Sequence, residues 1–183
     1  MDILIAGVGG QGTLLASRVL GKYAQIKGLD VKLSEVHGMA QRGGSVITFV
    51  RMGDKVNSPI IDFGGADVVL AFEKLEALRY AHYLKEDGKT VYSTQEIMPM
   101  PVVTGAAEYP TDIETKLQNP IGIDAMKYAL LAGNAKAANS VMIGFLTKVM
   151  GFDYAAMKQA LIESVPQKLV EMNEKAFDLG YQA

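Results

Sequence analysis

A glycine-rich loop near the N-terminus has the residue types and spacing of an anion-binding turn. Residues 7–12 read Gly-Val-Gly-Gly-Gln-Gly, which is the pattern G-x-G-x-x-G with one additional glycine. Glycines allow a sharp turn that brings backbone N–H groups close to a ligand, and a following helix adds donors and the positive end of its dipole. We therefore expect phosphate, pyrophosphate or carboxylate to bind there. The candidate binding residues are Gly7, Gly9, Gly10, Gln11 and Gly12. The alternative is that the glycines only allow a strand and a helix to pack closely.

A second glycine-rich segment, residues 34–46, carries polar side chains suited to binding. It reads Ser-Glu-Val-His-Gly-Met-Ala-Gln-Arg-Gly-Gly-Ser-Val. An arginine can hold a phosphate or carboxylate with two hydrogen bonds, and a histidine can donate, accept or titrate near neutral pH. The candidate binding residues here are His37, Gln41, Arg42, Gly43 and Gly44. The alternative interpretation gives Arg42 a surface salt bridge and His37 a loop-stabilising hydrogen bond.

The predicted elements place both segments at one edge of a sheet. The apolar run at residues 2–6 predicts a buried strand, the spacing over 13–27 predicts a helix, and residues 31–34 predict a second strand. We expect these to form a Rossmann-like β-α-β unit with a parallel strand pair and a right-handed crossover. Because ligand crevices lie outside the carboxyl ends of parallel strands, the two glycine segments should face one crevice.

The following segments predict a mixed, mostly parallel sheet in a three-layer α/β/α arrangement. A strand at residues 46–52 follows the second strand too closely for a parallel crossover, so we expect a hairpin with residues 55–57. Further strands are predicted at residues 68–72, 90–93, 102–103 and 121–124, and helices at 74–86 and 111–117.

The C-terminal part of the chain is predicted to be helical. Helices are expected over residues 136–150, 154–163 and 166–179, with Asp153 capping the second and Gly180 ending the third. No linker-like composition separates this part from the sheet. We therefore expect residues 1–183 to form a single domain, with a sheet part at about 1–124 and a helical part at about 125–183. Apolar positions on these helices are a candidate subunit interface, and the isolated chain is expected to be able to self-associate.

Composition excludes several classes of function. The 183 residues are 49% hydrophobic and 21% charged, which is typical of a globular protein. The chain has no cysteine, which excludes disulfides, zinc–thiolate sites, thiolate-held iron–sulfur clusters and a cysteine nucleophile. A net charge of −2 argues against general nucleic-acid binding, and two histidines are too few for a histidine-rich metal site. There is no signal-peptide pattern and no apolar stretch near the roughly 20 residues of a spanning helix, so we expect a cytoplasmic protein with no membrane partner.

The two glycine segments together carry a family resemblance. GVGGQG followed by VHGMAQRGGSV resembles the gamma-type subunit of 2-oxoacid:ferredoxin oxidoreductases, with the pattern most similar to the small (beta) subunit of the indolepyruvate enzymes. Further matches that extend the resemblance over nearly the whole chain are Ser58-Pro59, residues 66–73, residues 75–79, Lys136-Ala137-Ala138-Asn139 and residues 176–181.

This resemblance implies a subunit of an oxygen-sensitive, multi-subunit enzyme of anaerobic metabolism. Such enzymes decarboxylate a 2-oxoacid with thiamine diphosphate and Mg, transfer the acyl group to coenzyme A, and pass two electrons through iron–sulfur clusters to ferredoxin. This chain has no cysteine and no GDG…N signature for thiamine diphosphate. Partner chains should therefore hold those cofactors, leaving this chain with no catalytic residue or metal and no activity alone.

The resemblance implies two roles for this chain. It would contact the other subunits, and its glycine segments would bind the phosphates of coenzyme A. Indolepyruvate or another arylpyruvate is the favoured substrate of the complex, while pyruvate, branched-chain 2-oxoacids and 2-oxoglutarate remain alternatives. A different hypothesis is a stand-alone oxidoreductase that binds NAD or FAD, with Gly7, Gly9 and Gly12 at the pyrophosphate and Glu35, 23 residues after Gly12, at the ribose. A third is an acyl- or nucleotide-binding regulatory module.

Overall fold

A computed structural model describes residues 1–38 and 43–183, and within them six strands form one sheet. The order across the sheet is β2-β3-β1-β4-β5-β6. The strands are β1 (Asp2–Val8), β2 (Asp30–His37), β3 (Ser45–Gly53), β4 (Ala66–Ala71), β5 (Leu84–Ser93) and β6 (Pro120–Ile123).

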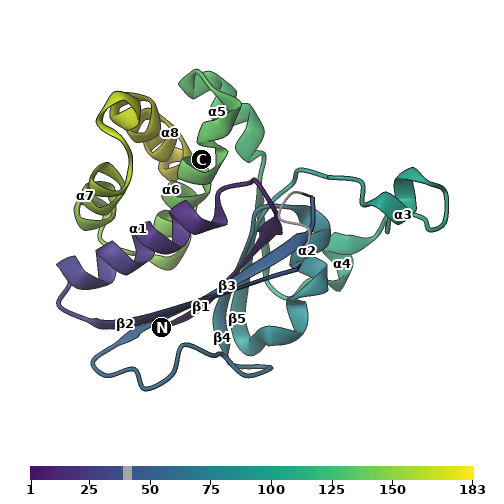
Figure 1. Ribbon diagram of the computed structural model, residues 1–183, viewed down its shortest axis with the longest axis horizontal. Helices are drawn as coiled ribbons and strands as arrows, with labels where there is room; N and C mark the ends of the chain where they lie inside the picture. The colour runs from purple at the N-terminus through teal and green to yellow at the C-terminus, as the bar shows by residue number, and fades with distance from the viewer. Residues whose placement is uncertain (39–42) are drawn as a thin grey trace.

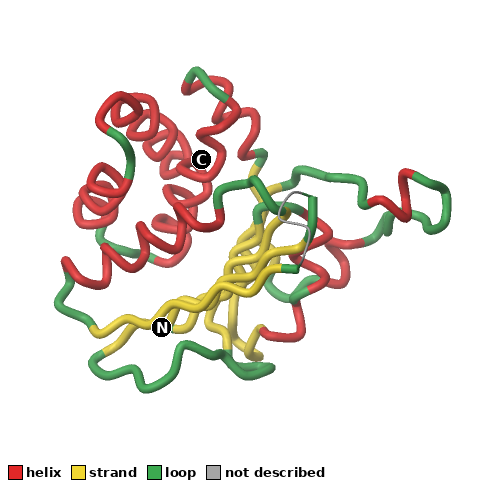
Figure 2. Tube along the Cα trace, viewed as in Figure 1, coloured by secondary structure: helices red, strands yellow, loops and turns green. Residues whose placement is uncertain are grey.

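Helices cover both faces of this sheet (Figure 1). The α-helices are α1 (Thr13–Ile26), α2 (Lys74–Arg79), α3 (Met100–Val103), α4 (Ile113–Lys116), α5 (Ala125–Ala132), α6 (Ala138–Met150), α7 (Tyr154–Ser164) and α8 (Val170–Gln182). Short 3₁₀ helices are η1 (Ala81–Tyr83), η2 (Ala135–Ala137) and η3 (Gln167–Leu169). Helix α1 and the C-terminal helices lie on one face, α2 and α4 lie on the other, and α3 projects away from the body (Figures 1 and 2). In the described parts of the chain, no helix combines the length and apolarity needed to cross a bilayer.

The sheet is mixed and mostly parallel, as predicted. Strands β1, β4, β5 and β6 pair in parallel, whereas β3 is antiparallel to both β1 and β2. The expected parallel pair of β1 and β2 is wrong, because β3 lies between them. All eight residues of β2 pair with β3, from Asp30 opposite Gly53 to His37 opposite Val46. The hairpin is therefore formed by β2 with β3, whereas residues 55–57, after Gly53-Asp54, form no strand.

Three other boundaries differ from the prediction. Strand β5 begins at Leu84, so the helix expected to reach residue 86 ends at Arg79. The glycine that suggested a helix end, Gly88, lies buried in β5, where a Cβ would come within 3.0 Å of the Ala66 carbonyl oxygen. Residues 102–103 belong to the short helix α3 and not to a strand. Residues 111–117 contain only the four-residue helix α4.

Alternating side chains of the strands supply two separate cores, one on each face. Ile3 and Ile5 pack with α1 and the C-terminal helices, while Leu4 and Ala6 pack with the α2 and α4 side. All four side chains are fully buried. Strands covered on both faces read as continuous apolar runs, which is why residues 2–6 and 68–72 predicted strands without alternation.

The C-terminal helices α6 and α8 touch through two glycines. A Cβ on Gly144 would overlap the Phe177 carbonyl oxygen, and a Cβ on Gly180 would overlap the Val141 carbonyl oxygen. Gly180 therefore lies inside α8 and does not end it, contrary to the prediction. By contrast, Asp153 caps α7 as predicted, because its carboxylate accepts the N–H of Ala156 at 3.0 Å. The close approach of α6 and α8 places the start of α6 beside the glycine loop.

Candidate functional site

The glycine loop connects β1 to α1 in a conformation that requires glycine. Gly10 and Gly12 have φ values of +105° and +85°, in the left-handed region that other residues rarely adopt. A Cβ on Gly7 would lie 2.9 Å from Cγ2 of Thr13. These constraints bring the chain sharply from the strand into the helix. The loop therefore presents its backbone at the carboxyl end of β1.

The N-terminus of α1 is open to a ligand. Gly12 is its N-cap and provides no side chain to satisfy the first turn. Within the described residues, the N–H groups of Gly12, Thr13 and Leu14 have no hydrogen-bond acceptor. The first turn also carries no acidic side chain. These free donors and the helix dipole favour an anion.

The two glycine segments hydrogen bond to each other. The N–H of Gly9 donates to the carbonyl oxygen of Gly44 at 2.8 Å. The N–H of Gly43 donates to the carbonyl oxygen of Gly9 at 3.3 Å. His37 is exposed at the end of β2, with its Nδ1 3.0 Å from the Gly38 carbonyl oxygen. Gln41 and Arg42 lie outside the described residues.

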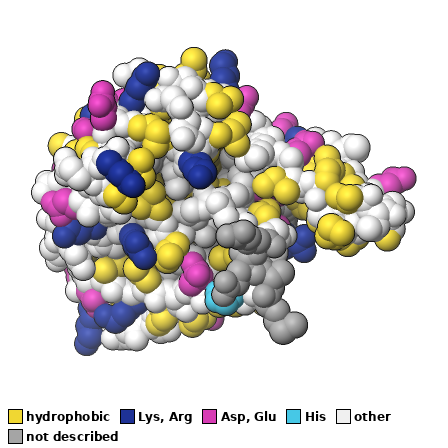
Figure 3. Space-filling view, turned by 45° about the horizontal axis from the view of Figure 1, so that its top comes forward, with side chains coloured by type: hydrophobic (Ala, Val, Ile, Leu, Met, Phe, Trp, Pro, Cys, Tyr) yellow, Lys and Arg dark blue, Asp and Glu magenta, His cyan; other side chains and the backbone are white. Residues whose placement is uncertain are grey.

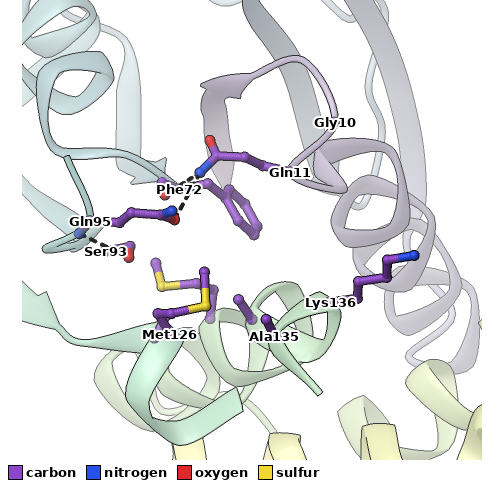
Figure 4. A pocket seen from close by; sticks show the side chains of 11 residues that line it. Gly10, Gln11, Phe72, Ser93, Gln95, Met126, Ala135 and Lys136 are labelled. Atoms are coloured by element: carbon purple, nitrogen blue, oxygen red, sulfur yellow. Dashed lines mark hydrogen bonds between the residues drawn. The ribbon is translucent and has the colours of Figure 1, made fainter. Parts of the chain in front are cut away.

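Gln11 holds the loop in shape. Its Oε1 accepts the N–H of Val8 at 2.8 Å, and its Nε2 donates to the Phe72 carbonyl oxygen at 2.9 Å and to Oε1 of Gln95 at 3.3 Å. Figure 4 shows the bonds to Phe72 and Gln95, which join the loop to the residues just after β4 and β5. The side-chain amide is therefore engaged by the protein, and Gln11 positions the loop.

A cavity of about 250 Å³ opens beside the loop on the side of α5 and α6. It is lined by Gly10, Gln11, Phe72, Ser93, Gln95, Ala125, Met126, Ala135, Lys136, Ala138 and Met142. Phe72 and the methionines give it apolar walls, and the Lys136 side chain lies at its rim (Figure 4). The volume is below the usual 300–1,000 Å³ of a drug-sized site, so it suits one part of a larger ligand.

A second hollow of about 400 Å³ lies on the other side of the same loop. It is lined by Gly9, Gly10, Gly12, Thr13, Leu14, Glu35, His37 and Val46, so it borders the N-terminus of α1. The Glu35 carboxylate would repel a phosphate there, whereas the first cavity has a lysine at its rim. The charged side chains therefore favour the first cavity for an anion, whereas the free backbone N–H groups of α1 border the second hollow.

Asn139, at the start of α6, points a buried amide at the loop. Its side chain is 9% exposed, and its Oδ1 accepts the N–H of Ser140 at 2.8 Å. Its Nδ2 has no acceptor among residues 1–38 and 43–183, and a Cβ on Gly12 would overlap it. This amide nitrogen can therefore donate a hydrogen bond to a ligand at the loop. Asn139 thus adds a donor to the open N-terminus of α1.

The prediction from sequence missed Asn139 and Lys136 as binding residues. Both lie in the Lys136-Ala137-Ala138-Asn139 match, to which the resemblance assigns no role. The N–H of Lys136 donates to Oδ1 of Asn134 at 2.9 Å, and this bond caps η2 and sets the turn that leads into α6. Only the tertiary contact between this turn and residues 7–12 shows that the two segments form one site.

Buried carboxylates behind the site position the second glycine segment. Glu76 is 3% exposed and accepts hydrogen bonds from the Ser45 hydroxyl and from Nε of Arg79, the latter at 3.1 Å. The Tyr80 hydroxyl lies 2.8 Å from the same Ser45 oxygen. Since Ser45 follows Gly44 directly, this network holds the start of β3 against α2. In the part of the chain that the structure describes, no cluster of three or more histidine or acidic side chains could hold a metal ion.

These features define a class of protein: an α/β chain with a six-stranded mixed sheet, a glycine loop at an open helix N-terminus and no cysteine to hold a redox cluster. The chain belongs to the pyruvate ferredoxin/flavodoxin oxidoreductase family, whose model matches residues 2–183. It is 44% identical over 191 residues to the indolepyruvate oxidoreductase subunit IorB of Pyrococcus horikoshii, covering 100% of this chain and 95% of that protein.

Solved structures of related proteins have the same fold. The gamma subunit of a keto/oxoacid ferredoxin oxidoreductase from Geobacter sulfurreducens is 26% identical, with a TM-score of 0.75 over 99% of this chain and 96% of that one. A 2-oxoglutarate:ferredoxin oxidoreductase from Magnetococcus marinus, solved with 2-oxoglutarate, coenzyme A and succinyl-CoA bound, is 19% identical, also with a TM-score of 0.75. The match spans 100% of this chain but only 30% of that longer chain.

The comparisons confirm the resemblance and the α/β/α fold. The chain is a small subunit of the indolepyruvate and 2-oxoacid ferredoxin oxidoreductase type, and so one component of a multi-subunit oxidoreductase. They do not support the alternative of a stand-alone oxidoreductase that binds NAD or FAD.

Proposed function

We propose that this chain binds the phosphates of coenzyme A for an arylpyruvate oxidoreductase whose other subunits perform the oxidation. The complex converts a 2-oxoacid and coenzyme A into acyl-CoA and CO₂, and the two electrons released reduce ferredoxin. The observation that carries the proposal is the open N-terminus of α1, with Nδ2 of Asn139 against Gly12 and the Lys136 side chain at the rim of the adjoining cavity.

The donor set fits a phosphate ester. Backbone N–H groups and a side-chain amide can bind phosphate oxygens directly, while lysine contributes a positive charge at the rim. The apolar walls of the cavity, Phe72, Met126 and Met142, can contact an uncharged part of the same ligand. The Magnetococcus marinus enzyme, which shares this fold, was solved with coenzyme A bound. We add Arg42 and Gln41 to the proposed site on the sequence pattern.

Partner subunits supply the remaining chemistry. They would hold thiamine diphosphate with Mg for the decarboxylation and iron–sulfur clusters for the electron transfer. This chain has no cysteine to bind such clusters. Its residues therefore bind and orient one substrate and contact the partner, without a catalytic side chain of their own. We place the complex in the cytoplasm, where ferredoxin accepts its electrons.

The experiment reconstitutes the complex and measures arylpyruvate-dependent reduction of ferredoxin at varied coenzyme A. Lys136→Ala and Arg42→Ala should each raise the apparent KM for coenzyme A about tenfold, which is the loss of about 1.4 kcal/mol of binding energy. The KM for the 2-oxoacid should stay within twofold. Lys55→Ala removes an exposed lysine at the opposite edge of the sheet and is the matched control, with no expected effect.

Three results would contradict the proposal at different levels. An unchanged apparent KM for coenzyme A in both variants would contradict the proposal that this chain binds coenzyme A. Tight binding of NAD or FAD by the isolated chain in calorimetry would favour the dinucleotide alternative. Purification from the native host only as a free monomer, without a large iron–sulfur partner, would contradict the role as a subunit.

A further inference from the structure

Residues 96–109 form an arm that projects from the body of the molecule and carries α3 (Figure 1). Large apolar side chains lie exposed on it: Met98 is 46% exposed, Met100 68% and Val103 64%. Figure 3 shows hydrophobic side chains gathered on this projection. Exposed apolar side chains that cluster on one projecting element mark an interaction site.

A single buried carboxylate fixes both ends of the arm. Glu73 is 1% exposed, and its Oε1 accepts the N–H of Ile97 at 3.0 Å and the hydroxyl of Tyr109 at 3.0 Å. Burial raises the pKa of Tyr109, and the charge of Glu73 raises it further, so the phenol keeps its proton and donates. Nearby, Nζ of Lys74 pairs with Glu96 at 3.1 Å. The root of the arm is thus bonded firmly to α2.

The tip of the arm is also held by its own backbone bonds. The N–H of Val102 donates to the Pro99 carbonyl oxygen at 2.9 Å, and that of Thr104 donates to the Met100 carbonyl oxygen at 2.9 Å. The N–H of Ala106 returns to the Pro101 carbonyl oxygen at 2.8 Å. The arm therefore presents its methionines and valine on a defined turn, where they contribute little to the cores of this chain.

We propose that the arm docks into an apolar groove on the larger, cofactor-bearing subunit of the same oxidoreductase. This inference rests on the proposed function. In the Magnetococcus marinus enzyme, the matching fold is only 30% of a longer chain, so there it is joined covalently to the remainder of that chain. A separate chain of this fold must make the equivalent association through its surface. The occupant we assign is therefore that subunit and not a second copy of this chain.

The position of the arm supports this occupant. Gln95, which precedes the arm, lines the cavity at the glycine loop and hydrogen bonds to Gln11. A hollow of about 340 Å³ runs from Gly43 and Ser45 to Met98 and Met100 at the base of the arm. A subunit seated on the arm would therefore border the glycine segments. A ligand held there must meet reaction chemistry that this chain lacks, so the partner has to lie on this side.

The charges around the arm specify the rim of the groove. Glu96, Glu108, Asp112 and Glu114 are exposed on the arm or beside its root. Lys116 is also exposed and pairs with Asp112 at 2.9 Å. Glu96 and Glu114 both pair with Lys74, and the arm and its root carry more acidic than basic side chains. The matching surface of the partner should be an apolar groove edged by lysine or arginine.

The test measures association of the full-length chain with its partner subunit. A Met100→Glu, Val103→Glu double variant should raise the Kd for the partner subunit at least 30-fold, because two charges would enter an apolar groove. Both positions are exposed, so its Tm should stay within 2 °C of the wild type. The matched control is Ile60→Glu, whose side chain is 46% exposed in the loop between β3 and β4, at the opposite edge of the sheet. That control should bind within twofold of the wild type.

A second measurement locates the contact directly. A photo-crosslinking amino acid at position 103 should link to the larger subunit in the assembled complex. Wild-type affinity in the double variant, or a crosslink only to a second copy of this chain, would overturn the docking proposal alone. If the unaltered chain does not associate with any cofactor-bearing subunit, the proposed function and the docking proposal both fail.

Discussion

At the scale of single residues, the site depends on donors that this chain leaves unsatisfied. Gly12 removes a Cβ that would block the loop, and Asn139 places its Nδ2 in that space. Gln11 uses both ends of its amide within the protein. Within the motif, Gln11 therefore shapes the loop. The free backbone N–H groups at the start of α1 and the Asn139 amide are the donors that we propose for an anion.

Replacing Asn139 by aspartate separates ligand binding from stability. The side chain keeps its shape but gains a negative charge at the N-terminus of α1, which favours the folded helix and repels phosphate. In the reconstituted complex, Asn139→Asp should raise the apparent KM for coenzyme A at least tenfold, while the Tm of the chain stays equal or rises. A fall in Tm of several degrees with an unchanged coenzyme A requirement would show that Asn139 is only structural.

At the scale of elements, close packing of α6 on α8 positions the start of α6. Gly144 and Gly180 let the two backbones approach within contact distance. A buried hydrogen bond from the Ser140 hydroxyl to Oδ1 of Asn173, at 2.6 Å, joins the same helices beside Asn139. The orientation of the Asn139 amide therefore depends on the contact between α6 and α8.

Gly144→Ala should destabilise the chain even though alanine favours helices. Alanine gains about 1 kcal/mol over glycine in a helix interior, but its Cβ would overlap the Phe177 carbonyl oxygen and force α8 to move. We expect the free energy of unfolding to fall by about 2 kcal/mol, as measured by urea titration. Gly53→Ala is the matched control, since a Cβ there meets nothing within 4 Å. Equal stability of the two variants would contradict this account of the helix contact.

At the scale of the whole molecule, the sheet and the C-terminal helices share one core. Ile3 and Ile5 of β1 lie in the same cluster of buried side chains as Leu146 of α6 and Phe177 of α8. We therefore propose that residues 1–183 fold as a single domain. The division near residue 124 separates kinds of element and not units that fold alone.

This proposal predicts one cooperative unfolding transition. Circular dichroism and tyrosine fluorescence should report the same Tm, because tyrosines lie on both faces of the sheet, such as Tyr23 and Tyr92. In calorimetry, the enthalpy should be about 130 kcal/mol near 60 °C, from roughly 0.7 kcal/mol per residue, and should equal the van't Hoff value. Two resolved transitions would show that the helical part unfolds separately.

Sequence alone determined the local features of this protein. The apolar runs of β1 and β4, the glycine loop, the helix that follows it and the Asp153 cap all depend on neighbouring residues, so their patterns predicted them. The family resemblance followed from the same local motifs. The absence of cysteine likewise showed, without any structure, that this chain has no thiolate to bind an iron–sulfur cluster.

Tertiary structure decided what depends on contacts between distant residues. The place of β3 between β1 and β2 depends on pairing energies along whole strands, which the Gly53-Asp54 turn signal did not reveal. The interior position of Gly180 depends on its contact with Val141, and the role of Asn139 depends on its contact with Gly12. In each case the residue type is local but its partner is remote, and only the folded chain brings the two together.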